Sequence, residues 1–165
     1  MAEIRFEDIK QKHLREVLDI YLYYVLNTTA TFHTCAVSLK EMQDIVYFDK
    51  PKYKTYAISD NDGVCGYVIL SPYKTREAYS NTAEVTVYLK HDRLGKGLGR
   101  LAVQYIEDYA RVQGIHVLVA TICGENNRSI RVFEKCGFSK CAHYKEVGQK
   151  FGRLLDVVAY QKILN

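Results

Sequence analysis

The stretch AEVTVYLKHDRLGKGLGRL, residues 83–101, joins an alternating apolar segment to a glycine loop and then to a helical pattern. The apolar positions of residues 83–90 alternate with polar ones, which predicts a strand with one face toward the core. Three glycines follow at every second position, Gly95, Gly97 and Gly99. A glycine loop between a strand and a helix typically directs backbone amides toward an anion. The stretch therefore predicts an anion site in an α/β protein.

The spacing of the glycines excludes two familiar nucleotide loops. A Walker A loop needs a lysine after its last glycine and then a hydroxyl, whereas Lys96 precedes Gly97 and no hydroxyl follows Gly99. In a Rossmann loop the third glycine comes one residue later and the loop lies near the first strand. A plain turn remains an alternative, but it does not explain three glycines at the start of a helix. The favoured interpretation is a pyrophosphate site, with Lys96 and Arg100 adding charge to the helix dipole.

Length and composition indicate one globular domain. The chain has 165 residues, of which 48% are hydrophobic, and this suits a single core. The net charge of +4 fits an anionic small ligand and lacks the dense basic patch of a nucleic-acid-binding protein. No segment approaches the roughly 20 apolar residues of a membrane span. The N-terminus, MAEIRFEDIK, is too charged for a signal peptide.

The cysteines and histidines predict neither disulfides nor a metal site. The chain has five cysteines, none of them in a Cys-x-x-Cys pair, and the odd number argues against a disulfide framework. Reduced thiols indicate a cytoplasmic protein. The histidines lack the spacing of metal ligands, so no metal is assigned.

Periodicity predicts a mixed α/β fold with one main sheet. Alternating or apolar runs predict strands over residues 3–7, 53–59, 64–70, 83–90, 115–122, 138–147 and 153–163. Helical spacing predicts helices over residues 10–27, from 38 onward, from 98 to about 114, and over 126–136. Ser38 and Glu41 form a capping box at the second of these helices, and Gly137 closes the last.

The stretch quoted above, together with NNRSIRVFEKCGF at residues 126–138, resembles the GNAT N-acetyltransferase superfamily. The acetyl-CoA loop of that family reads Gln/Arg-x-x-Gly-x-Gly/Ala, and Gly97 and Gly99 match its two small positions. Its Gln/Arg position falls on Leu94, which departs from the pattern. Backbone amides do most of the holding, so we expect binding to survive, with Lys96, Arg100 or Arg93 compensating. The later helix matches an Asn-x-x-Ala/Ser…Gly-Phe pattern through four positions, Asn126, Ser129, Gly137 and Phe138.

Within that superfamily the chain is most similar to phosphinothricin acetyltransferases, and the resemblance covers nearly its whole length. Its segments TATFHT, SPYKTREAYSNTAEVTVYL and GQKFGRLLDVVAYQKIL resemble the early substrate loop, the central segment and the C-terminal segment of that family. The resemblance implies a GNAT-like acyl-CoA N-acyltransferase fold over residues 1–165, with a central, mostly antiparallel sheet flanked by helices. It also implies a homodimer, formed through the C-terminal β segments or the tyrosine-rich first helix.

The resemblance further implies transfer of an acetyl group from acetyl-CoA to a primary amine. The amine arrives protonated, so a general base is required, and Glu84 matches the base of the family. A carboxylate beside apolar residues and a thioester has a raised pKa; the alternative is a solvated Glu on an edge strand. Backbone amides around Tyr88 and Leu89 would stabilise the oxyanion. Phe133 stands where the family usually has His or Tyr, so either Tyr88 or Tyr144 acts as the acid or CoA leaves as a thiolate.

The candidate site residues fall into two sets. The expected acetyl-CoA positions are Val87, Tyr88, Leu89, Leu94, Gly95, Lys96, Gly97, Leu98, Gly99, Arg100, Asn126 and Ser129. The expected substrate positions are Phe32, Lys74, Arg76, Tyr79 and Tyr88.

Two cations and a phenol suit a carboxylate or a phosphinate, sulfone or sulfoximine group, and the implied substrate is a small amino acid analogue such as phosphinothricin or methionine sulfone. A solvated loop for the cations and core packing for Phe32 and Tyr88 remain alternatives. Two other functions also remain open. One is a GNAT enzyme for a different amine, such as a polyamine or a protein N-terminus, and the other is a non-catalytic acetyl-CoA-binding module.

Overall fold

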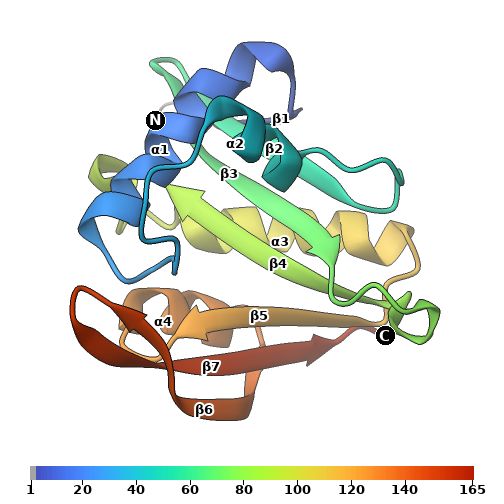
Figure 1. Ribbon diagram of the computed structural model, residues 1–165. Coiled ribbons are helices and arrows are strands. Elements are labelled where there is room, and N and C mark those ends of the chain that lie inside the picture. The colour runs from blue at the N-terminus through green and yellow to red at the C-terminus, as the bar shows by residue number, and fades with distance from the viewer. Residues whose placement is uncertain (1–2) are drawn as a thin grey trace.

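The computed structural model describes residues 3–165 and contains one seven-stranded sheet with helices on both of its faces (Figure 1). The strands are β1 (Arg5–Asp8), β2 (Lys54–Asp60), β3 (Gly63–Pro72), β4 (Thr82–Leu89), β5 (Val117–Cys123), β6 (Ser139–Lys150) and β7 (Arg153–Ile163). The α-helices are α1 (Leu14–Asn27), α2 (Leu39–Val46), α3 (Leu98–Val112) and α4 (Asn127–Lys135). Short 3₁₀ turns are η1 (Gln11–His13), η2 (Glu77–Tyr79) and η3 (His91–Arg93).

The sheet has the order β1-β2-β3-β4-β5-β7-β6, and every neighbouring pair is antiparallel except β4 and β5. The parallel pair β4–β5 is connected through η3 and α3, which lie between the two strands in the sequence. A crossover of this kind is what parallel neighbours require. The prediction of a mixed α/β fold with a mostly antiparallel sheet is confirmed.

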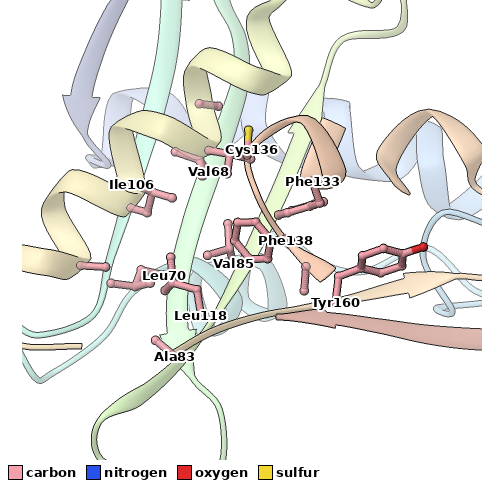
Figure 2. Packing of buried hydrophobic residues seen from close by; sticks show 14 of the residues in the cluster. Val68, Leu70, Ala83, Val85, Ile106, Leu118, Phe133, Cys136, Phe138 and Tyr160 are labelled. Carbon is pink, nitrogen blue, oxygen red and sulfur yellow. The ribbon is translucent and has the colours of Figure 1, made fainter. Parts of the chain in front are cut away.

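Each face of the sheet carries its own hydrophobic core. On one face α1 and α2 pack over β3, around residues such as Val17, Met42 and Tyr67. On the other face α3 and α4 pack around Val85, Ile106 and Phe138, as the close view in Figure 2 shows. Buried Val85 and Leu89 contribute to the second core, which confirms the alternation predicted for residues 83–90. Glu84, Thr86 and Tyr88 consequently project toward the face covered by α1 and α2.

Local sequence signals explain where the helices begin and end. Ser38 caps α2 by accepting from the Glu41 amide, and the Glu41 carboxylate accepts from the Ser38 amide in return. A cap of this kind contributes about 0.5–2 kcal/mol. Gly137, with φ 89°, follows α4 in the left-handed conformation that a helix C-terminus favours. Both signals were predicted from sequence.

The C-terminal hairpin differs most from its prediction. The sequence predicts that the sixth strand ends near residue 147, but β6 continues to Lys150, and its last three residues pair with Leu155, Leu154 and Arg153 of β7. A register shift between Tyr144 and Gly148 interrupts the pairing, and Glu146 has φ 57° there. This irregularity masked the end of the strand, because the pattern of alternating residues breaks at a bulge.

Candidate active site

The parallel pair β4–β5 is short, and the site forms where it ends. Only Thr82, Ala83 and Glu84 of β4 have partners on β5. From Val85 to Leu89 the strand pairs with β3 alone, and in Figure 1 the two strands diverge from this point. The backbone groups of β4 on that side therefore lack a strand partner. Glu84 is the last paired residue, so it lies at the point of divergence.

The glycine loop leads into α3 beside the space between the diverging strands β4 and β5, which we call the gap. Gly95 and Gly97 have φ of 75° and 78°, and an added Cβ at either would meet nothing within 4 Å. Gly97 is the N-cap of α3, and its carbonyl accepts the first helical bond, from the Leu101 amide. The amides that precede Leu101 in the first turn therefore have no carbonyl partner within the helix. A Cβ at Gly99 would contact Val132 of α4 and Leu89 of β4, so the loop adjoins both elements.

The charged residues around the loop differ in whether they already form ion pairs. Lys96 and Arg100 are exposed, and within residues 3–165 neither forms an ion pair. Arg93 is paired with Asp60 at 3.2 Å and Asp62 at 3.0 Å, so its charge is already compensated. Leu94, at the position where the resemblance expects Gln or Arg, packs against the core. Its side chain therefore contributes to folding, and Lys96 and Arg100 are the available cations.

The start of α4 lies on the other side of the gap. The Asn126 side chain accepts a hydrogen bond from the Ser129 amide at 3.2 Å and thereby caps the helix. Both predicted residues thus meet at one helix N-terminus. Phe133, farther along the helix, is 4% exposed and packs edge-on against Phe138 (Figure 2). It provides no proton, and its ring belongs to the hydrophobic core.

Glu84 is the titratable group at the point of divergence. It is partly buried, and burial raises its pKa above the ordinary 4.5, opposed by a smaller effect of the Thr121 side chain. Its cross-strand neighbour is Ser71 of β3. A carboxylate in this position accepts a proton more readily than an exposed one. Across residues 3–165 no group of three or more His, Cys, Asp or Glu side chains is arranged to bind a metal ion.

A cavity of about 220 Å³ opens on the same face of the sheet as Glu84. It is lined by Tyr21, His33, Ile45, Phe48, Tyr67, Ile69, Ser71, Thr86 and Tyr88. In the β3–β4 register, Ser71 lies opposite Glu84, Ile69 opposite Thr86, and Tyr67 opposite Tyr88. The cavity therefore runs along this strand pair, from the position beside Glu84 toward the tyrosines under α1.

Tyr88 contributes its ring to this cavity. Its hydroxyl donates to the Ala30 carbonyl at 3.4 Å, and burial raises the pKa of its phenol. The Glu84 carboxylate raises that pKa further, which places the two groups within electrostatic reach of each other. Tyr144, the other proposed acid, lies on β6 and is 54% exposed. Of the two phenols, Tyr88 shares a strand and a face with Glu84.

The predicted substrate loop follows β3 and returns to β4 just before Glu84. Lys74 lies over the rings of Tyr73 and Tyr79, with its Nζ 5.3 Å from each ring centroid. Arg76 is exposed and begins the turn η2. The structure thus gathers Lys74 and Tyr79 into one cluster, at the end of the β3–β4 pair where Glu84 lies.

Phe32 belongs to a second loop, residues 28–34, which the C-terminal hairpin holds in place. Its ring packs on Gly148 so closely that a Cβ there would collide with it. The Lys150 side chain is 3% exposed and donates to the Thr31 carbonyl at 2.8 Å. Burial lowers the pKa of this lysine. Sequence reasoning missed Lys150, because a lysine in a polar turn gives no sign of burial.

A salt bridge reinforces the same loop from outside. Arg153 of β7 binds Glu125 through two hydrogen bonds of 2.8 and 2.9 Å, and Glu125 accepts from Thr29 at 2.6 Å. The Arg153 guanidinium lowers the pKa of Glu125 to about 2. Loop 28–34, the start of α4 and the C-terminal hairpin are therefore linked beside the gap.

A seven-stranded sheet that opens at one parallel pair, with a glycine loop and a partly buried carboxylate at the opening, is the arrangement of an acyltransferase-type site. A family model described as acetyltransferase (GNAT) domain matches residues 6–159. The chain belongs to this GNAT acetyltransferase family. The predictions of family, fold class and enzyme class are confirmed.

Curated relatives and solved structures support the same family. A phosphinothricin N-acetyltransferase of Streptomyces coelicolor is 30% identical over 99% of this chain and 98% of its own. An L-methionine sulfoximine/L-methionine sulfone acetyltransferase of Pseudomonas aeruginosa is 38% identical over 88% of this chain and 86% of its own. The crystal structure of a GNAT superfamily phosphinothricin acetyltransferase from Sinorhizobium meliloti, in complex with acetyl-CoA, has a TM-score of 0.92 and 30% identity. It covers 99% of this chain and 89% of its own.

Proposed function

We propose that the chain transfers the acetyl group of acetyl-CoA to the α-amine of a small amino acid analogue of the phosphinothricin or methionine sulfone/sulfoximine type, with Glu84 as general base. The observation that carries this proposal is the partly buried Glu84, whose pKa is raised, at the point where β4 and β5 diverge. The named activities of the relatives supply the substrate type. We take residues 1–165 as one GNAT domain, because a single sheet runs from β1 to β7.

The glycine loop fits the pyrophosphate of acetyl-CoA. The space around Gly95 and Gly97 is open, and the first-turn amides of α3 lack carbonyl partners. Lys96 and Arg100 are exposed beside them and supply full positive charges. Val87 and Leu89 direct their backbone groups to the unpaired side of β4, because the alternate residue Tyr88 is hydrogen-bonded to β3, and the amides of Val87 and Leu89 have no strand partner there. Asn126 and Ser129 border the gap from α4.

Acetyl-CoA supplies an activated carbonyl, and the residues of this chain prepare the amine. The amine binds as an ammonium and must lose a proton before it attacks. Glu84 accepts that proton, since burial brings its pKa closer to the working pH. Amides of the unpaired side of β4 near Tyr88 and Leu89 donate to the developing oxyanion. Tyr88 keeps its proton because its pKa is raised, and to donate that proton to the leaving sulfur its hydroxyl would turn from the Ala30 carbonyl, which it contacts at 3.4 Å.

The loop cations are assigned to the carboxylate of the acceptor. We expect Lys74→Ala and Arg76→Ala each to raise KM for methionine sulfone and phosphinothricin about tenfold, because each removes a charge-assisted contact. Lys12→Ala, an exposed lysine on the N-terminal side of the sheet, is the control and leaves KM unchanged. The measurement is CoA release across a panel of amino acid analogues, polyamines and N-terminal peptides. Turnover restricted to polyamines or peptides would overturn the substrate assignment. Tight acetyl-CoA binding without any turnover would favour a non-catalytic module.

The outer face of the C-terminal hairpin is assigned to a homodimer contact. The hairpin exposes five large apolar side chains, Tyr144, Val147, Phe151, Leu154 and Ile163. β6 is the last strand of the sheet, so its outer edge offers unpaired backbone groups. We expect sedimentation velocity to give twice the chain mass of 19.0 kDa, and Val147→Glu to shift the protein toward the monomer. A wild-type monomer at micromolar concentration would contradict the assignment.

The cellular assignment rests on the cysteines of the sequence, whose number and spacing suit reduced thiols. No helix within residues 3–165 combines the length and the apolar character that a bilayer span requires. All five cysteines are free in the structure. We assign the protein to the cytoplasm, with acetyl-CoA and a small amine as its partners.

A further inference from the structure

One phenol of α1 reaches the unpaired side of β4. The Tyr24 hydroxyl donates to the Leu89 carbonyl. The amide of the next residue, Lys90, donates to the Cys65 carbonyl of β3, and successive residues of a strand direct their backbone groups to opposite sides. The carbonyl and amide of Leu89 therefore point away from β3, into the gap. The Tyr24 hydroxyl consequently lies beside one of the backbone amides that we assign to the oxyanion.

The same hydroxyl lies within electrostatic reach of α4. Burial raises the pKa of Tyr24 to about 12, and the guanidinium of Arg128 opposes this rise. Arg128 is an exposed residue in the first turn of α4, so the phenol lies between the unpaired side of β4 and the start of that helix. With a pKa this high, Tyr24 stays protonated at neutral pH and acts as a donor.

The other candidate donors point elsewhere. Phe133 of α4 has no proton to give. The Tyr88 side chain lines the cavity on the acceptor face, and its hydroxyl donates to the Ala30 carbonyl. Tyr144 is 54% exposed on the edge strand β6. Of these three phenols, Tyr24 is the one whose hydroxyl bonds to the unpaired side of β4.

Tyr24 is also held firmly in place. Its own carbonyl accepts from the Thr28 amide at 3.2 Å and from the Thr28 hydroxyl at 2.9 Å, and the Lys150 ammonium contacts it at 3.5 Å. Its ring packs against the ring of Tyr88, with the centroids 5.2 Å apart. The hydroxyl hydrogen can rotate about the C–O bond, so it can leave the Leu89 carbonyl while the ring stays in place. A fixed ring with a movable proton suits a proton donor.

We propose that Tyr24 is the general acid of the reaction and gives its hydroxyl proton to the leaving sulfur. The inference rests on the proposed function. The amine nitrogen bonds to the acetyl carbon, the carbon–sulfur bond breaks with its electron pair on sulfur, and the proton of Tyr24 completes the thiol. The ammonium loses two protons in all, one to Glu84 before the attack and one to the Tyr24 phenolate after it. Glu84 passes its proton to water, so one proton is released in each turnover.

The first test measures binding without turnover. Calorimetry compares CoA with desulfo-CoA at about pH 9, where a thiol with a pKa of about 8.5 is largely ionised and Tyr24 is not. We expect the wild type to bind CoA about tenfold more tightly than desulfo-CoA, because the phenol donates a charge-assisted hydrogen bond to the thiolate. In Tyr24→Phe the two affinities should lie within about twofold of each other. The affinity for desulfo-CoA should stay unchanged, which shows that the variant keeps a folded site.

The second test measures turnover with L-methionine sulfone. We expect Tyr24→Phe to lower kcat about tenfold and to leave KM unchanged. This loss is smaller than that expected for removal of the base, because a thiolate is itself a tolerable leaving group. Tyr23→Phe is the matched control, since Tyr23 is the adjacent tyrosine of the same helix and stacks on His91. It should change neither kcat nor the ratio of the CoA and desulfo-CoA affinities.

Two results would overturn the inference and leave the proposed function standing. One is the same ratio of CoA to desulfo-CoA affinity in Tyr24→Phe as in an active wild type, which would make Tyr24 a packing residue. The other is a loss of that ratio in Tyr88→Phe but not in Tyr24→Phe, which would assign the proton to Tyr88. If the wild type acetylates no amino acid analogue, the proposed function and this inference fail together.

Discussion

Glu84→Gln is expected to lower kcat by about 10²–10⁴ while acetyl-CoA binds with unchanged affinity. Glutamine keeps the shape of the side chain but cannot accept the ammonium proton. The proposed pyrophosphate site lies at the start of α3, which the substitution does not touch. The measurements are kcat from CoA release and acetyl-CoA affinity from calorimetry. Glu3→Gln, an exposed residue before β1, is the matched control and leaves both values unchanged. An unchanged kcat in Glu84→Gln would remove Glu84 from the mechanism.

The pH profile gives the same residue a second test. As the proposed base, Glu84 would act only when it is deprotonated, and its raised pKa means that it keeps its proton to a higher pH than an ordinary glutamate. Activity should therefore fall as the pH drops through a value above the ordinary 4.5. In Glu84→Gln the fall of kcat/KM at low pH should disappear, whereas any pH dependence caused by ionisation of the substrate should remain. A variant that retains the limb would assign the titration to another group.

Gly97→Ala is expected to weaken acetyl-CoA binding at least tenfold. The added methyl group occupies the open space in front of the first-turn amides and displaces the anion from them. It also strains the backbone, because a φ of 78° costs a residue with a Cβ about 1–2 kcal/mol. Calorimetry measures the affinity for acetyl-CoA, and chemical denaturation measures the free energy of unfolding, which the strain lowers.

Gly114→Ala separates these two effects. Gly114, beyond the other end of α3, has φ 73° and equally open surroundings, so the strain is matched. We expect both variants to lose a similar stability and only Gly97→Ala to lose acetyl-CoA affinity. Equal affinities in the two variants would exclude the loop from the binding site.

The local elements of the fold were predictable because their signals lie within a few residues of each other. The alternation of residues 83–90, the Ser38 capping box and Gly137 each act over one to four positions. The family resemblance then identified Glu84, the glycine loop and Asn126, and the structure arranges these three around one gap. Their catalytic and binding roles stay predictions.

The remaining features depend on partners that are distant in the sequence. The sequence suggested Arg93 as a compensating cation, but Asp60 and Asp62 of the β2–β3 hairpin already hold it. The pairing of β4 with β5 is only three residues long because the two strands twist apart. The sequence of one strand alone does not predict where this separation begins. The burial of Lys150 and the contact of the Tyr24 hydroxyl with Leu89 likewise arise only when the sheet and α1 come together.

The link between loop 28–34 and the C-terminal hairpin bears on the order in which the protein folds. Lys150 bonds to a carbonyl 119 positions earlier in the chain, and Arg153 reaches Thr29 through Glu125. Contacts of such high sequence separation carry a large loop-closure cost and form late. A nascent chain can therefore complete the sheet from β1 to β4, with loop 28–34 in contact with Tyr21 and Tyr88, before Lys150 and Arg153 have been made. The contacts that join loop 28–34 to the C-terminal hairpin form only when the last two strands have been made.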